Sequence, residues 1–157
     1  MPNMSLNRTG KWNPGGGRWI EIVPAVALAS YTISSVASAP TVVLSPSWSF
    51  TRIYCTPGTL QYRESKKNTD NGFLHDLEIK GFSPDDSPDK RAQIENLAQY
   101  QTFLVRFQDT AGLTRLAGTK IEPLLLEFEL STDSDVPGSR GYNLSFSGTL
   151  TAPAAYE

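Results

Sequence analysis

Residues 124–130 read LLLEFEL and residues 142–150 read YNLSFSGTL, and these two segments decide the fold. In each, apolar residues occupy every second position and polar residues take most of the positions between them. A period of two places the apolar side chains on one face of a β-strand, so both segments are expected to be strands with one buried face. A slip of one residue would expose the whole apolar set, which makes the register of such strands specific.

Further strands are expected on the N-terminal side of this pair. The run at 18–23 stops at Pro24, and in 48–55 the side chains of Trp48, Phe50, Arg52 and Tyr54 would form one mostly aromatic face. Residues 25–40 are small and β-branched, and they predict weak strands or a loop. The remaining expected strands are 41–44, 75–81, 103–108 and 113–117.

One helix is expected at about residues 87–99. Ser87 can cap its start, Pro88 suits the first helical position, and Asp89 favours the positive end of the helix dipole. Ile94 and Leu97 then fall on one narrow stripe that can pack on a sheet. Many strands and one helix predict a mostly β chain, either a β-sandwich or a small barrel with one flanking α-helix.

The length of 157 residues fits a single domain, expected at 18–157, which follows an extended N-terminal arm at 1–17. The arm is polar, contains three consecutive glycines, and has few apolar residues to anchor it. Trp12 is the exception. It is expected to dock either on its own domain or on a neighbouring subunit.

A charged segment at 56–72 interrupts the apolar pattern. From Arg63 to Gly72 it contains no apolar residue. Such a run predicts a solvated loop or hairpin tip, and it can also become ordered against a neighbouring subunit. Arg63, Lys66 and Lys67 are therefore candidate interface residues.

Composition excludes several classes of function. The formal net charge is -2 and the pI about 5.4, which argues against a general affinity for nucleic acid. The single cysteine, Cys55, allows no disulfide within the chain. No uninterrupted apolar run reaches about 18 residues, so we expect no membrane span, and the polar N-terminus does not look like a signal peptide.

Few residues of this sequence are candidates for catalysis or for metal binding. His75 is the only histidine and stands beside Asp76 without a nucleophile pattern, and Cys55 with one histidine cannot build a zinc site. The acidic groups near residues 85–89 and 133–135 lack the spacing of a calcium loop. We therefore expect no enzyme, no metal and no cofactor.

The C-terminal half resembles small structural proteins of tailed-phage morphogenesis clusters, especially those of Bacteroidetes phages. The resemblance covers roughly half the chain and lies in the order of its pieces rather than in a diagnostic motif. The pieces are Leu77 to Lys80, Ser87 to Gln99, Thr102 to Gly112, Leu116 to Gly118, Leu124 to Leu130, the acidic loop Asp133 to Asp135, Gly141-Tyr142 and Phe146-Ser147-Gly148.

The resemblance implies a non-catalytic virion subunit, assembled in the cytoplasm of the host bacterium. The tail-tube family would fit, and it implies stacked hexameric rings of this chain, in contact with other virion proteins, around a channel that DNA passes without specific binding. Glu127 and Glu129 would then face the channel, although they can equally solvate an exposed sheet. The alternatives are a neck or tail-terminator ring, a capsid decoration protein, and a β-sandwich module for carbohydrate or peptide that would use Trp12, Trp19 and Trp48.

Overall fold

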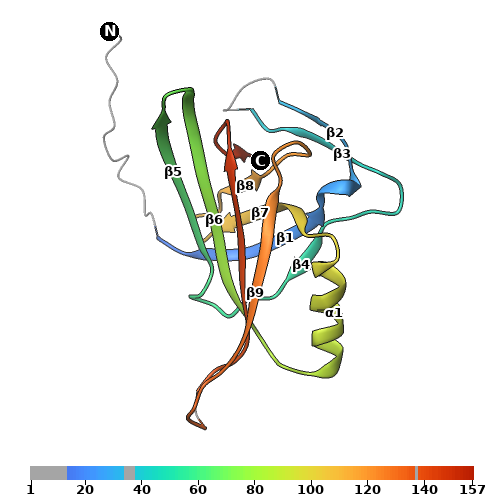
Figure 1. The fold of residues 1–157 in the computed structure, drawn as a ribbon, viewed down its shortest axis with the longest axis vertical. Helices are drawn as coiled ribbons and strands as arrows, with labels where there is room; N and C mark the ends of the chain where they lie inside the picture. The colour runs from blue at the N-terminus through green and yellow to red at the C-terminus, as the bar shows by residue number, and fades with distance from the viewer. Residues whose placement is uncertain (1–13, 34–37, 137) are drawn as a thin grey trace.

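The computed structural model describes residues 14–33, 38–136 and 138–157, which form β-strands and one α-helix (Figure 1). The strands are β1 (Gly17–Pro24), β2 (Leu28–Thr32), β3 (Thr41–Leu44), β4 (Thr51–Ile53), β5 (Gln61–Thr69), β6 (Gly72–Pro84), β7 (Thr102–Asp109), β8 (Thr114–Ala117), β9 (Leu124–Thr132), β10 (Arg140–Leu150) and β11 (Ala155–Tyr156). Helix α1 spans Pro88–Ala98 and the 3-10 helix η1 spans Ala25–Ala27. The predicted mostly β chain with one flanking helix is confirmed.

Antiparallel pairing builds one large sheet that bends into two layers. The first layer has the strand order β9-β10-β6-β5, and the second has the order β4-β1-β7-β8-β11. The layers join where Phe103 at the start of β7 pairs with Leu124 of β9. On the far side the Gly17 N–H donates to the Leu60 carbonyl (3.1 Å), which brings β1 beside the start of β5. Figure 1 shows the upright strands of the first layer crossing β1 and β7, as in a sandwich close to a barrel.

The main core lies between the two layers and uses the alternation seen in the sequence. Leu144 and Phe146 of β10 are buried, and the Phe146 ring meets Phe103 of β7 edge to face at 6.0 Å. Each such aromatic side chain contributes roughly 1.5–3 kcal/mol on burial. Helix α1 packs Ile94 against this core, and the Ser87 hydroxyl caps the helix by accepting the Lys90 N–H (3.2 Å).

A second, smaller core lies on the other side of β7. Leu104 of β7 and Leu116 of β8 are buried there against Val23 and Leu28, and the small β2-β3 sheet covers them. Strand β7 is therefore buried on both faces, which explains why residues 103–105 are all apolar. No helix of the described residues is long and apolar enough to cross a membrane.

The predicted strand at 48–55 is wrong in length. Only Thr51–Ile53 forms a strand, because its pairing with β1 is limited to Ile20–Ile22. That pairing places Ile53 opposite the buried Ile20, so Ile53 packs on the core and Cys55 is buried. Of the predicted aromatic face, Phe50 packs on the smaller core, whereas Trp48 and Tyr54 are exposed.

The segment at 56–72, predicted as a solvated loop or hairpin tip, is a loop only at its two ends. Residues 61–69 form β5, which pairs with β6 through a tight turn at Asp70 and Asn71. A strand this polar is stable because β6 supplies the hydrogen bonds along one side, while Tyr62 packs on Phe107 with the ring centroids 5.3 Å apart. Only the short connection before β5 and the turn remain loop.

The last residues of the predicted arm belong to the domain. The Thr110 hydroxyl donates to the carbonyl oxygen of Gly15 (2.6 Å), the Thr110 N–H donates to that of Gly16 (3.2 Å), and Gly17 begins β1. Residues 1–13, including Trp12, lie outside the described part of the chain.

Candidate assembly surface

The first layer turns one face to the core and the other to solvent, and we name the solvent side the outer face. Strand pairing arranges the side chains of the outer face in rows that cross all of the layer or part of it. The rows are Glu129, Asn143 and Phe82; Glu127, Ser145, Lys80 and Gln61; Leu125, Ser147, Glu78 and Arg63; and Thr149, Asp76 and Ser65. The outer face is thus mainly polar, with charged groups near both edges.

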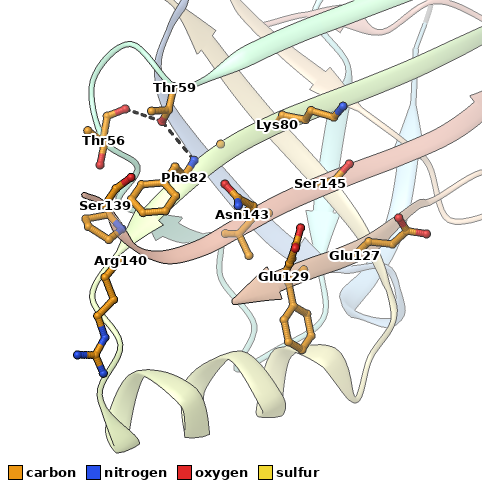
Figure 2. Close-up of a pocket in the computed structure, with 14 residues that line it drawn as sticks. Thr56, Thr59, Lys80, Phe82, Glu127, Glu129, Ser139, Arg140, Asn143 and Ser145 are labelled. Atoms are coloured by element: carbon orange, nitrogen blue, oxygen red, sulfur yellow. Dashed lines mark hydrogen bonds between the residues drawn. The ribbon is translucent and has the colours of Figure 1, made fainter. Parts of the chain in front are cut away.

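A wide hollow of about 910 Å³ lies on the outer face (Figure 2). Glu127 and Glu129 flank it from β9, and the short loop at 56–59 flanks it on the other side. The Thr59 hydroxyl holds this loop in place, because it donates to the Thr56 carbonyl (2.6 Å) and accepts the Phe82 N–H (3.2 Å). The hollow is open, which suits contact with a large partner or with water better than enclosure of a small molecule.

Some charges of the outer face form salt bridges and others do not. Lys80 pairs with Glu78 (3.0 Å), and Lys67 pairs with Asp76. Hydrogen bonds from Lys67 and Thr149 hold the pKa of Asp76 below its ordinary value. In the described part of the chain, no salt bridge involves Glu127 or Glu129 on β9 or Arg63 on β5.

The structure separates the three cations that the sequence singled out. Arg63 and Lys67 share the outer face with Glu127 and Glu129. Lys66 points to the other side of β5, where its Nζ lies 4.0 Å from the centre of the Phe73 ring. The sequence showed no basic residue on this face of β9 and β10, but the neighbouring strands β6 and β5 add Lys80, Arg63 and Lys67. This could not be foreseen without knowing that β5 is a strand of the same layer.

Among the described residues, both edges of the first layer are open over most of their length. Of the strands in the described part of the chain, only β6 pairs with β5 along residues 61–69. Strand β9 pairs with β10, and its other edge bonds to β7 only at Leu124 and Leu125, followed by the Leu126 N–H to the Gln101 carbonyl (3.1 Å). Within the described ranges, no strand covers that edge of β9 after Leu126. Open edges present unpaired N–H and C=O groups to a partner.

The inner side of the β5–β6 hairpin carries a polar cluster with no catalytic arrangement. Burial and a hydrogen bond to Glu64 raise the pKa of Tyr62, and His75 Nδ1 lies 3.5 Å from a Glu64 oxygen. This ties the base of the hairpin to the C-terminal segment, because the Ala154 N–H also donates to Glu64 (3.4 Å). The described residues contain no cluster of His, Cys, Asp or Glu that could hold a metal ion.

The tryptophans that could line a carbohydrate groove are engaged separately. Arg52 covers the ring of Trp19 at 4.5 Å, and Arg52 also binds Glu21 (2.8 Å). Trp48 meets Tyr100 edge to face at 5.6 Å. No contact joins Trp19 and Trp48 in the described residues, so they do not form one aromatic platform.

The geometry therefore gives a mainly polar, solvent-facing sheet with two edges that no strand of the described residues covers over most of their length. A search of protein-family models, of curated protein sequences and of solved structures finds no match to this chain.

Proposed function

We propose that this chain is a non-catalytic structural subunit of a phage virion, and that its copies join side by side into the stacked rings of a tail tube. The outer face lines the channel, and assembly takes place in the host cytoplasm. The observation that carries the proposal is that no strand of the described residues covers the outer edges of β9 and β5, the two edges of one layer, over most of their length. A subunit with an open edge on each side of a sheet can bond to a copy on its left and a copy on its right.

The number of strands in the layer suits a closed ring. The four strands β9, β10, β6 and β5 alternate in direction. When each copy is placed head to tail beside the next, β5 of one copy therefore runs antiparallel to β9 of its neighbour. The alternation continues around the ring without a break, so the rings form one closed barrel that has no exposed edge.

The unpaired charges at the two edges set a register for this contact. If Glu129 of one copy lies opposite Arg63 of the next, then Glu127 lies opposite Ser65 and diagonal to both Arg63 and Lys67. Both glutamates then gain a cation, and opposite charges across antiparallel strands each contribute roughly 0.2–1 kcal/mol. Residues 127–131, which β7 leaves free, form the pairing segment.

The same register gives a reasonable barrel. Within one copy, pairing through Ser145 and Lys80 puts Glu127 level with Gln61. Glu129 and Arg63 are displaced from that row by two residues each, in opposite directions, so the contact needs a shift of four residues per copy. A register shift of four residues across the four strands of one copy amounts to one residue per strand. An eight-stranded barrel with a shear of 8 has the same shift per strand, and its strands tilt by about 36°.

The charge of the outer face suits the passage of DNA. The face carries the acids Asp76, Glu78, Glu127 and Glu129 and the bases Arg63, Lys67 and Lys80, so the acids exceed the bases by one. Lys67 and Lys80 are already paired, and the lateral contact would pair Arg63. A wall without free cations does not hold phosphate groups, so a duplex can slide past it.

Sedimentation velocity and negative-stain microscopy of the purified full chain test the proposal. With rising concentration we expect closed rings of uniform diameter that stack into tubes. A single unstacked ring would favour the neck or tail-terminator role, since the lateral contact serves that function equally well. A chain that stays monomeric at all accessible concentrations would overturn the proposal.

A further inference from the structure

The hairpin of β5 and β6 ends in an exposed aromatic residue. Phe73 is 58% exposed, and Lys66 lies over its ring at 4.0 Å. Both residues are on the side of the hairpin that faces the core lower down, but here the hairpin projects beyond the body of the domain (Figure 1). The turn is ordered by the Thr69 hydroxyl, which donates to the Gly72 carbonyl (2.7 Å). The tip therefore presents an aromatic ring and a cation on a pre-formed support.

The opposite end of the molecule carries the complementary chemistry. The hairpin of β9 and β10 projects from the other end of the long axis, and Val136 in its loop is fully exposed (Figure 1). Asp133 and Asp135 stand in the same loop, and the Asp133 carboxylate accepts the Ser139 N–H (2.6 Å), which shapes the loop. Asp85 is exposed near the base of the same hairpin, since its N–H donates to the Arg140 carbonyl (3.2 Å).

We propose that these two ends are docking surfaces for a second copy of this chain, so that Phe73 of one copy packs on Val136 of a copy in the next ring and Lys66 faces Asp133 and Asp135. This inference rests on the proposed ring and names the contact that stacks one ring on another. Two exposed apolar side chains leave water together, and the cation meets carboxylates that have no salt bridge among the described residues.

The other charges at the two ends leave the complementarity in place. The carboxylate of Asp70 in the β5–β6 turn reduces the positive charge of the tip, and the charge of Lys67 is neutralised by Asp76. At the acidic end, Arg140 is paired with Asp86 (2.8 Å). Among the described residues, Lys66 is therefore the cation of the tip that has no salt bridge, and the acidic end keeps an excess of carboxylates.

Cross-linking between separately labelled copies tests the contact. The Phe73→Cys and Val136→Cys proteins are mixed and treated with a short bismaleimide, and the Arg63→Cys and Glu129→Cys proteins are mixed as the lateral pair. The native Cys55 stays silent because it is buried. We expect each mixture to give a cross-linked dimer, and neither protein of a pair to give that dimer alone.

The two pairs separate the two proposals. A lateral cross-link without an axial one would overturn the docking of Phe73 on Val136 and leave the ring standing. An axial cross-link without a lateral one would overturn the ring and leave an end-to-end filament. If neither pair cross-links, both proposals fail.

A second test uses particle length. Phe73→Ser should leave the ring diameter unchanged and abolish stacking, so that negative-stain images show single rings. Leu113→Ser, which removes another half-exposed apolar side chain in the β7–β8 turn, is the matched control and should leave tubes of normal length. Tubes of normal length in Phe73→Ser would contradict the inference.

Discussion

Glu129 of β9 and Arg63 of β5 lie on the same outer face at opposite edges of one four-stranded layer, and neither has a salt-bridge partner among the described residues. Within one copy they are too far apart to meet, because β10 and β6 stand between them. In the ring that we propose, they would become direct partners in neighbouring copies.

Charge reversal at one edge should weaken the ring, and reversal at both edges should restore it. Arg63→Glu places a carboxylate opposite Glu129 of the next copy, so we expect assembly to require a concentration roughly tenfold higher, which corresponds to about 1.4 kcal/mol. The double variant Arg63→Glu with Glu129→Arg should recover most of the loss. Sedimentation velocity measures both effects.

Lys80→Glu is the matched control for that swap. Lys80 sits in the middle of the same face and pairs with Glu78 of its own strand, away from either edge. It should alter assembly much less than Arg63→Glu does. Equal effects of the two reversals would show that net charge, and not the edge contact, controls assembly.

A cation added to the outer face should create an affinity for DNA. The assembled wild-type protein should not bind a DNA duplex detectably at about 0.15 M salt, whereas Glu127→Lys should bind it with an affinity that falls steeply as salt rises. Glu95→Lys on α1 makes the same charge change away from this face. Fluorescence anisotropy of a labelled duplex measures the affinity of each variant for DNA. Equal binding by both variants would place Glu127 outside the channel.

The pairing of β10 with β6 should not tolerate a side chain at Gly141, which lies opposite Pro84. A Cβ built there would lie 2.4 Å from the Ser83 carbonyl oxygen and 2.8 Å from the Pro84 Cα, which are backbone atoms that cannot move aside. Gly141→Ala is expected to lower the free energy of unfolding by roughly 1–3 kcal/mol in urea denaturation. Gly15→Ala, where nothing lies within 4 Å, is the control and should leave it nearly unchanged.

The thiol of Cys55 should be inert in the folded protein. Burial raises the pKa of Cys55 to about 11, and Lys90 only partly opposes this. Because the folded pKa lies above the ordinary value of 9.0, this group adds stability that is fully present below about pH 9 and is lost as the pH rises through about 11. At about pH 8 a disulfide reagent such as DTNB should label the thiol rapidly only after urea unfolding. Equally fast labelling of the native protein would rule out the buried site.

The strands with strict alternation were predictable from the sequence. In β7, β9 and β10 the apolar period and the core face agree with the expectation, and the helix starts at the expected Ser87 cap. In each of these segments the local pattern and the tertiary packing require the same conformation.

The sequence predicted a solvated loop or hairpin tip at 56–72, but it could not show that residues 61–69 form a strand, because pairing with β6 decides that conformation. Strand β5 contains only one apolar residue, Tyr62, so its strand conformation comes from pairing with β6 and not from its own pattern. For the same reason the sequence could nominate Arg63, Lys66 and Lys67 but could not say that two of them share a face with Glu127. The short β4 shows the same dependence on a partner, since the alternation runs from Trp48 to Cys55 but pairing with β1 makes a strand of Thr51–Ile53 alone.

Electron cryomicroscopy of the assembled full chain tests the ring most directly. We expect a reconstruction in which β5 of each copy bonds to β9 of the next, with Glu129 beside Arg63 of the neighbour and the outer face lining a continuous channel. A particle that carries the outer face on its outside, or in which β5 and β9 belong to no contact between copies, would contradict the account.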